Sequence, residues 1–351
     1  MKKKSLRSVF ILAASIANAW YMPQKAESFT FTARTLGSFQ SSAIPNSALL
    51  HHAGEDPVEV DLKTFANSAL TVANTVSSLQ NQILVVKYGG NAMTSPELSA
   101  GFCQDVATLQ KLGLKVVVVH GGGPQINNLL KKLNVESSFA SNGMRISSAE
   151  VVEGAALALC GQVNKDIANG ICNAGGNAIG LSGRDAKLLE CEKQLEDGGV
   201  DLGFVGSVKR VNTSFLNRLL DIGVTPVIAP IGCGMVENGE EKVVYNVNAD
   251  VAAGRVAGEL KAARVIFLTD IAGVLDKEKN LLKKLNMQDV KNLIDDETIT
   301  GGMIPKVSFA TDAIRLGVKG AFITDGRVPH ALVNEVLTLG SGLGGTVIAA
   351  E

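Results

Sequence analysis

The sequence predicts an α/β protein, a three-layer αβα sandwich with a mostly parallel central sheet and two lobes. Short apolar runs rich in β-branched residues, such as 83–86 and 115–120, are typical of strands buried on both faces. They alternate with longer segments of helical spacing, and this alternation builds parallel sheets. A chain of 351 residues, 46% hydrophobic and 19% charged, is long enough for two lobes around one continuous sheet.

The N-terminal part has its own composition and predicts a targeting sequence. Residues 1–54 contain six Lys or Arg but one acidic residue. A basic start, an apolar run over 9–17 and a small-x-small site ending at Ala19 predict a signal peptide over 1–19. Residues 20–60, rich in Ser, Thr and Ala, are transit-like. The two segments together resemble the bipartite presequences of algae with complex plastids, so we expect the plastid stroma, with secretion as the alternative.

Composition also bounds the possible functions. The five cysteines contain no C-x-x-C pair, which favours free thiols in a reducing compartment. The four histidines show no zinc spacing, so we expect no protein-held metal site. The net charge of −1 gives no basic surface for nucleic acid, and no apolar run is long enough to span a membrane.

Residues 61–82 predict an N-terminal oligomerisation helix. Its apolar residues recur at spacings of three and four, while Thr, Asn, Ser and Gln occupy most other positions. So narrow a seam suits a contact between two helices, although a helix lying on its own domain fits the pattern equally well. The seam consists of Leu62, Phe65, Ala69, Val72, Val76 and Leu79.

Strands and helices alternate through the rest of the chain. Apolar runs predict strands over 83–87, 115–120, 178–181, 224–231, 264–269 and 321–324. Helical spacing predicts helices over about 96–112, 123–133, 147–174, 246–261 and 300–317. Polar turns between alternating residues predict hairpins over 187–213 and around Gly239, leading into 242–245.

Glycine loops follow two of the predicted strands. Lys87 ends the first strand and is followed by Gly89 and Gly90, whereas the second strand leads directly into the glycines 121–123. Glycine lets backbone N–H groups turn towards a ligand without a Cβ in the way. Because the carboxyl ends of parallel strands share one sheet edge, the two loops predict a common site for a phosphoryl group.

Lys87, Asp250 and Lys306 are the candidates for chemistry at this site. Asp250 lies near the start of a predicted helix, and Lys306 follows a glycine turn near another. Two lysines could offset the negative charge of a transferring phosphoryl group, and one aspartate could fix both ammonium groups. The sequence offers no convincing Ser-His-Asp or Cys-His set, and His120 is interpreted as structural.

Six motifs occur in order along the chain: VVKYGGNAM, VVVVHGGGPQIN, GMR, YNVNADVAAG, TDIAGVLD and GGMIPKV. In this order they resemble the motifs of the N-acetyl-L-glutamate kinases of the amino-acid kinase family. The resemblance covers about residues 65–349 and implies a carbamate kinase-like fold. Within residues 83–351 it implies a substrate-binding lobe to about residue 230 and an ATP-binding lobe after it.

The resemblance implies ATP-dependent phosphorylation of the side-chain carboxylate of N-acetyl-L-glutamate, the second step of arginine biosynthesis. A carboxylate of pKa ~4.3 is already ionised at neutral pH, so this nucleophile needs no general base. Mg²⁺ would be held mainly by the ATP oxygens and water.

Site residues are also implied by the resemblance. Lys87 and Lys306 would stabilise the transition state, and Asp250 would organise them. Backbone amides of Gly89, Gly90, Gly122 and Gly123 would bind phosphoryl oxygens, the last two also the substrate. Arg145 and Asn246 would bind the substrate. The ATP site would be lined by Asp270, Ile271, Ala272, Gly273, Val274, Leu275, Thr298, Ile299 and Thr300.

Arginine-sensitive members of the family use an extra N-terminal helix to join dimers into a hexamer, and they bind arginine near the C-terminal part. The resemblance therefore implies a homo-oligomer, a dimer or a trimer of dimers, inhibited by arginine. His330 and Glu335 are the candidate regulatory residues. The glycine-rich residues 339–345 depart from the family pattern, because they lack the acidic residue often found there.

Two other functions are compatible with the same predicted fold. Another amino-acid kinase, acting on glutamate or aspartate, would share the fold, but Arg145 in GMR and Asn246 in YNVNAD speak against it. A non-catalytic arginine or nucleotide sensor would also share the fold. The presence of both Lys87 and Lys306 speaks against that rival.

Overall fold

The structure, a computed structural model, describes residues 62–93, 95–140, 143–195, 201–239, 242–338 and 344–350. The predicted signal peptide (1–19) and transit-like segment (20–60) lie outside the described residues. The chain divides into two units after Thr71, and the sheets and the site belong to the second.

Helix α2 (Leu62–Leu79) ends three residues before the predicted limit of 82. Its end is marked by Asn81, whose backbone is left-handed at φ 60°. Asparagine tolerates this conformation better than most residues, which stops the helix before the first strand.

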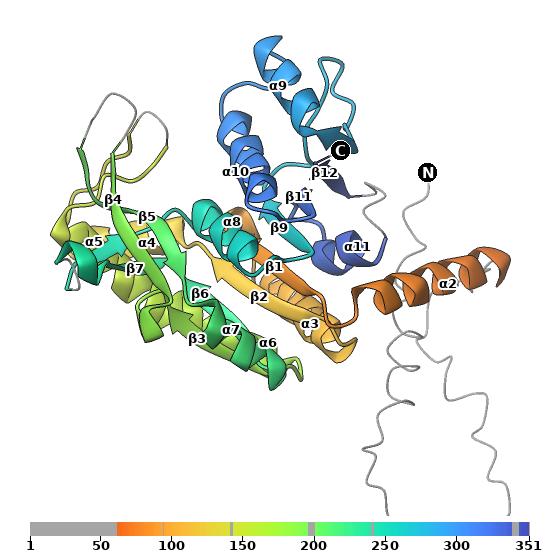
Figure 1. The fold of residues 1–351 in the computed structure, drawn as a ribbon, viewed down its shortest axis with the longest axis horizontal. Coiled ribbons are helices and arrows are strands. Elements are labelled where there is room, and N and C mark those ends of the chain that lie inside the picture. The colour runs from red at the N-terminus through yellow and green to blue at the C-terminus, as the bar shows by residue number, and fades with distance from the viewer. Residues whose placement is uncertain are drawn as a thin grey trace, which may run out of the picture. The chain divides into compact units, whose positions relative to one another are not determined.

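The central sheet has eight strands in the order β10-β12-β11-β9-β1-β2-β6-β3 (Figure 1). The strands from β11 through β9, β1, β2 and β6 to β3 are parallel to one another, whereas β12 is antiparallel to β11 and parallel to β10. The mostly parallel sheet predicted from the sequence is therefore confirmed. The strands are β1 (Ile83–Tyr88), β2 (Lys115–His120), β3 (Ala178–Ser182), β6 (Thr225–Ala229), β9 (Arg264–Thr269), β10 (Lys284–Asn286), β11 (Gly320–Asp325) and β12 (Gly345–Ala349).

Helices cover both faces of this sheet and complete the three layers (Figure 1). On one face α7 (Thr213–Asp221), α8 (Ala249–Glu259) and α10 (Met303–Arg315) pack in one apolar core with side chains of β1, β2 and β9. On the other face lie α3 (Pro96–Lys111), α6 (Asn164–Asn173) and α11 (Ala331–Leu337). Helix α9 (Met287–Asp295) contacts β10 and α10.

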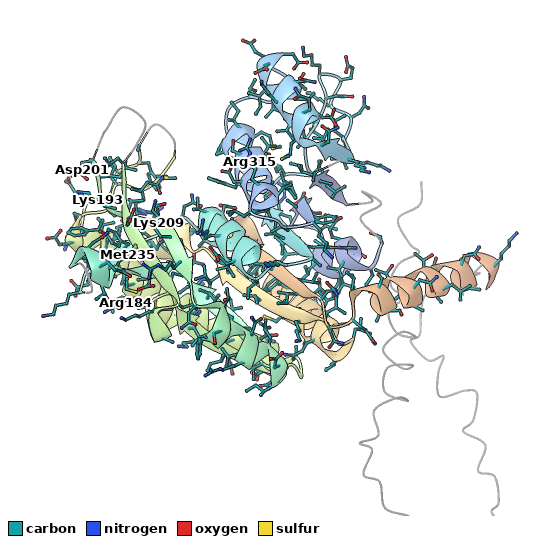
Figure 2. All side chains as sticks on the ribbon, in the orientation of Figure 1. Arg184, Lys193, Asp201, Lys209, Met235 and Arg315 are labelled. Carbon is teal, nitrogen blue, oxygen red and sulfur yellow. The ribbon has the colours of Figure 1, made fainter. Side chains whose placement is uncertain are left out.

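A second, small closed sheet contains β4 (Leu189–Leu195), β5 (Asp201–Val211), β8 (Val244–Asn246) and β7 (Ile231–Gly234). Both predicted hairpins occur here, because β4 pairs antiparallel with β5 and β7 with β8. Lys193 and Asp201 form an ion pair of 2.8 Å between β4 and β5 (Figure 2). The single strand predicted over 224–231 is wrong: it divides into β6 and β7 at Pro230, which has no N–H for a ladder.

The long helix predicted over 147–174 is interrupted by a π-helix. Helix α5 (Ala149–Ala156) leads into the π-helical segment η2 (Leu157–Val163), which continues directly into α6. Helix α4 (Gly123–Lys132) packs against both α5 and η2. No helix in the described ranges is long and apolar enough to cross a membrane.

Candidate functional site

The two glycine loops lie side by side at the carboxyl edge of β1 and β2. The N–H of Gly121 donates to the carbonyl oxygen of Tyr88 at 2.8 Å. A Cβ on Gly89 would lie 3.3 Å from Lys87 Nζ and 3.6 Å from the backbone nitrogen of Gly121. Gly90, at φ 70°, turns the chain away from the strand. This edge therefore presents backbone amides next to a lysine ammonium group.

Gly122 and Gly123 open helix α4 but differ in the space around them. A Cβ on Gly122 would lie 2.5 Å from Cδ2 of Leu159, a buried residue of η2. A Cβ on Gly123 would meet no atom within 4 Å. The π-helical segment thus supports the back of the loop, and the positive end of α4 faces the same edge as its amides.

Lys87 pairs with Asp250 inside this edge. Lys87 Nζ lies 3.3 Å from Asp250 Oδ1, and the two side chains are 13% and 22% exposed. Asp250 is the second residue of α8, where Asn248 caps the helix by accepting the Asp250 N–H. A helix start favours a carboxylate electrostatically, so α8 both places and stabilises Asp250.

Lys306 pairs with a different aspartate from the one expected. Lys306 Nζ, in the first turn of α10, lies 3.1 Å from Oδ1 of Asp270, which directly follows β9. The hydrogen bond from Lys306 lowers the pKa of Asp270. The expectation that Asp250 fixes both ammonium groups is thus not met, because Lys87 contacts Asp250 and Lys306 contacts Asp270.

Both pairs nevertheless lie at one edge of the sheet. Strands β1 and β9 are adjacent and parallel, with Lys87 opposite Phe267, so Asp270 follows just beyond the same edge. Neighbouring strands are about 4.8 Å apart. The positive groups of β1 and α10 therefore surround one region, together with the glycine amides.

Arg145 is held in a polar shell beside α4. Its Nη2 donates to Asn127 Oδ1 at 2.7 Å, its Nη1 donates to Ser137 Oγ, and its guanidinium lies 4.5 Å from the Phe139 ring centre. The residue is 8% exposed, and burial lowers the pKa of its guanidinium. These contacts fix the plane of the fork.

Asn246 connects to Arg145 through a residue that sequence reasoning missed. Asn246 Nδ2 donates to Ser147 Oγ at 3.2 Å, and Ser147 Oγ donates to the carbonyl oxygen of Arg145 at 3.0 Å. Ser147 is fully buried, and its backbone carbonyl oxygen lies 2.3 Å from where a Cβ of Gly203 would stand. The sequence could have pointed to Ser147 only through its position two residues after the GMR motif.

The segments predicted to line a nucleotide site follow β9 and α9. In both, some side chains face inward: Val274 and Ile299 are buried in the apolar core, so only their backbones could meet a ligand. Asp270, Ala272 and Thr300 are exposed. Gly273, at φ 139°, passes so close to Thr346 that a Cβ would lie 2.7 Å from its Oγ1.

The two candidate regulatory residues belong to the start of α11 and to α11 itself. His330 Nδ1 lies 2.6 Å from Oδ1 of the buried Asp105 on α3. Glu335 is 2% exposed, and burial raises its pKa although Arg264 and Thr324 favour the charged form. Within the described residues, Glu335 Oε2 accepts no hydrogen bond. Residues 339–343 of the glycine-rich segment lie outside the described residues.

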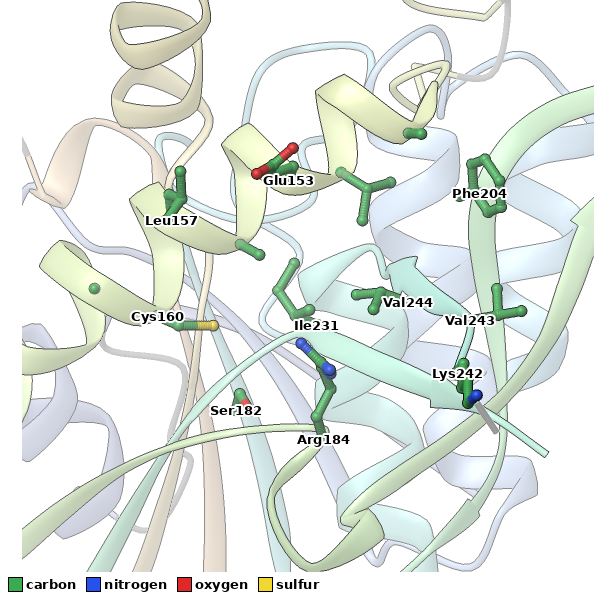
Figure 3. A pocket seen from close by; sticks show the side chains of 14 residues that line it. Glu153, Leu157, Cys160, Ser182, Arg184, Phe204, Ile231, Lys242, Val243 and Val244 are labelled. Atoms are coloured by element: carbon green, nitrogen blue, oxygen red, sulfur yellow. The ribbon is translucent and has the colours of Figure 1, made fainter. Parts of the chain in front are cut away.

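A pocket of about 800 Å³ opens elsewhere, between α5, η2 and the small sheet (Figure 3). Its wall is mainly apolar, with Leu157, Phe204 and Ile231, and Arg184 and Lys242 also line it. None of the predicted site residues lines it. The described residues hold no cluster of three or more His, Cys, Asp or Glu side chains suited to a metal ion. Asp250 and Asp270 each face a lysine, which suits a magnesium ion brought by a nucleotide better than one held by the protein.

Comparison with known proteins supplies the family. The amino acid kinase family model matches residues 82–325. Over 281 residues, 78% of this chain and 94% of the relative, the chain is 46% identical to the acetylglutamate kinase of Geobacter sulfurreducens.

Two solved structures share the fold. The N-acetylglutamate synthase of Neisseria gonorrhoeae, complexed with coenzyme A and N-acetyl-glutamate, matches with a TM-score of 0.70 at 22% identity. That match covers 82% of this chain and 64% of the synthase chain. Carbamate kinase from Giardia lamblia bound to AMP-PNP matches with a TM-score of 0.56 at 17% identity, covering 77% of this chain and 99% of that one. By sequence, the chain belongs to the amino acid kinase family and, within it, to the acetylglutamate kinases.

Proposed function

We propose that the protein transfers the γ-phosphoryl group of ATP to the side-chain carboxylate of N-acetyl-L-glutamate, a step of arginine biosynthesis. The observation that carries this proposal is the pair of lysine–aspartate contacts, Lys87 with Asp250 and Lys306 with Asp270, at one sheet edge beside two glycine loops. Positive charge and backbone amides at one edge suit a transferring phosphoryl group.

The acceptor carboxylate acts as the nucleophile without a base, because it is ionised above a pH of about 5. Its oxygen attacks the γ-phosphorus while the bond to the β-phosphate oxygen breaks, giving an acyl phosphate and ADP. Lys87 and Lys306 offset the charge on the transferring and leaving oxygens, and the amides of Gly122 and Gly123 donate to them. A magnesium ion bound to ATP would add charge neutralisation.

Arg145 and Asn246 are proposed to hold the substrate. A guanidinium fork with a fixed plane suits the α-carboxylate, which it can meet with two hydrogen bonds. Asn246 can donate to, or accept from, the acetamido group. Their connection through Ser147 supports one shared substrate site, and Asn127 and Ser137 would orient the fork.

A substrate panel tests the activity. ADP release is measured with N-acetyl-L-glutamate, L-glutamate, L-aspartate and N-acetyl-L-aspartate at equal concentrations. We expect turnover with N-acetyl-L-glutamate and at least about 100-fold less with the unacetylated acids, since unpaired polar groups discriminate strongly. Turnover with glutamate or aspartate alone assigns another amino-acid kinase, and no turnover with any acid assigns a sensor.

Feedback inhibition by arginine is a second part of the proposal. Glu335 offers a buried carboxylate oxygen without a hydrogen bond from the described residues, and a guanidinium is a natural partner for it. His330 lies beside the same helix. L-arginine should inhibit ADP release and D-arginine should not. Glu335→Gln should raise the half-inhibitory arginine concentration at least tenfold, each rate being normalised to that variant without arginine; an unchanged value contradicts the role of Glu335.

We also propose a homo-oligomer. Among the described residues no strand pairs with the outer edge of β3, where Ile179 is 41% exposed. Leu157 and Phe204, which line the pocket, are 57% and 40% exposed. An open strand edge with exposed apolar neighbours suits pairing with a second copy. Light scattering should give a dimer or a hexamer. A hexamer that survives deletion of 62–82 contradicts the role of that helix, and a wild-type monomer contradicts the oligomer.

Import into a plastid is the last part of the proposal and rests on residues 1–60. A fluorescent protein fused after residue 60 should accumulate in the stroma of an alga with complex plastids. Deletion of 1–19 should leave the fusion in the cytosol. Secretion of the full fusion would assign the alternative destination.

A further inference from the structure

His120, the last residue of β2, is fully buried and touches the second glycine loop. Its Nδ1 lies 2.8 Å from the carbonyl oxygen of Gly121, and its Nε2 lies 3.1 Å from Nδ2 of Asn164. A carbonyl oxygen only accepts and an amide nitrogen only donates. Nδ1 therefore carries the hydrogen and Nε2 carries the lone pair, which makes the ring neutral and fixes its tautomer.

Asn164 cannot turn its amide round. Its Nδ2 also lies 2.8 Å from the carbonyl oxygen of Val227 on β6 and 3.2 Å from that of Leu181 on β3. The residue is fully buried and opens α6 directly after the π-helical segment. The two hydrogens of Nδ2 are thus shared among these two carbonyls and the His120 ring, and a turned amide would bring Oδ1 against both carbonyl oxygens. A second ring hydrogen, on Nε2, would point at the hydrogens of this amide nitrogen and be repelled by them. Burial also lowers the pKa of His120, to about 4.

The peptide between Gly121 and Gly122 is held by this arrangement. The Gly121 N–H donates to Tyr88, and the Gly121 carbonyl oxygen accepts from His120. A trans peptide is planar, with its C=O and N–H pointing in opposite directions. The direction of the Gly121 carbonyl therefore sets the direction of the Gly122 N–H, one of the amides proposed to bind a phosphoryl oxygen.

We infer that His120 and Asn164 are positioning residues for phosphoryl transfer. Asn164 fixes the tautomer of His120, and His120 aims the Gly122 N–H at the transferring group. The inference rests on the proposed function, because it assigns an aiming device to an amide of that site.

Three substitutions of His120 separate its two ring nitrogens. Asn places a donor near the position of Nδ1, Gln places one near the position of Nε2, and Leu provides none. We expect kcat to fall about 100-fold in His120→Leu and His120→Gln but less than about fivefold in His120→Asn. KM should change less than about threefold, because the amide acts mainly on transition-state charge. Equal losses in Asn and Gln variants, or losses confined to KM, overturn the inference.

The variants are assayed with whichever acid of the substrate panel the wild type phosphorylates. Failure of N-acetylglutamate as substrate then contradicts the proposed function without deciding this test. Thr225→Val is the matched control: Thr225 is buried, accepts from Gln110 Nε2 at 3.0 Å, and lies at the opposite end of the sheet on β6. It should lower the melting temperature and leave kcat unchanged.

A second readout does not depend on turnover. Nitrogen-15 NMR of the ring should show His120 Nδ1 protonated and Nε2 unprotonated at pH 7, the signals being assigned by their loss in His120→Asn. An imidazolium or the opposite tautomer overturns the inference, even for a fully active enzyme. If His120→Leu does not fold, two results still test the inference: the difference in kcat between His120→Asn and His120→Gln, and the tautomer of His120 in the wild type.

Discussion

The two lysine–aspartate pairs of the site differ in how far water reaches them. Lys87 and Asp250 are 13% and 22% exposed, on a central strand and a helix start. Lys306 and Asp270 are 30% and 48% exposed, on a first helical turn and a loop. Charges act more strongly where water is excluded. The positive charge of Lys87, in the inner pair, is thus suited to act on the phosphoryl group from a fixed position. The side chains of the outer pair, Lys306 and Asp270, are suited to move as a nucleotide enters and leaves.

The largest effect is expected from removal of the inner ammonium group. Lys87→Met should lower kcat at least about 1,000-fold, because its charge lies in the least hydrated part of the site. Lys115→Met is the control: Lys115 also belongs to a strand and pairs with Asp221 at 2.7 Å, but at the opposite edge of the sheet. Its kcat should be unchanged. A loss below tenfold in Lys87→Met would break the comparison.

Removal of the outer ammonium group should cost less. Lys306→Met should lower kcat about 100-fold and raise the KM for ATP, since a more hydrated charge contributes less field. Steady-state kinetics with both substrates varied measures the two effects. A loss equal to that of Lys87→Met would show that exposure does not rank the two lysines.

The aspartates sharpen the same contrast. Asp250→Asn should lower kcat about tenfold, because it leaves Lys87 without its partner in a poorly hydrated place. Asp270→Asn should lower kcat at most about threefold and act mainly on the KM for ATP, since water can replace this carboxylate. Isothermal titration with ADP separates the binding part. A greater kcat loss in Asp270→Asn would reverse the assignment of fixed and adjustable pairs.

The smallest effect concerns stability in acid. The pKa of Asp270 is lowered mainly by the hydrogen bond from Lys306, so its contribution is present above the unfolded pKa of about 3.9 and is lost as pH falls through the folded value. Wild type and Asp270→Asn should thus differ slightly in melting temperature at pH 6, and the difference should vanish as the pH falls through the lowered pKa of Asp270. Added salt should shrink the difference at pH 6. A difference that persists in acid would contradict the ion-pair origin.

The sequence predicts the sheet well where pattern and burial coincide. Strands β2 and β9 have the predicted bounds. Both are buried on both faces by helices, so the apolar run in the sequence and the strand in the sheet have the same length. Pattern did not predict α7, α9, α11 or the short strands β10 and β12. These elements are short and depend on tertiary packing. The π-helical segment η2 also left no signal, because its residues follow ordinary helical spacing.

Pairing within the site could not be predicted in the same way. Motif order indicates that Lys87, Asp250 and Lys306 share a site, but the choice of partner depends on distances between loops. Asp270 directly follows β9, whereas Asp250 is the second residue of α8, and only the coordinates show which lysine each of them contacts. Likewise the role of Ser147 follows only from its hydrogen bonds in the structure, which link Arg145 to Asn246.

The place of β1 in the sheet has a consequence for biosynthesis. Its neighbours are β2, which follows it in the sequence after α3, and β9, which is translated much later. Until β9 leaves the ribosome, one side of an apolar central strand has no partner, and such an edge invites association between nascent chains. We therefore expect productive folding to be favoured when that edge is shielded, by a chaperone or by delay, while the second half is made.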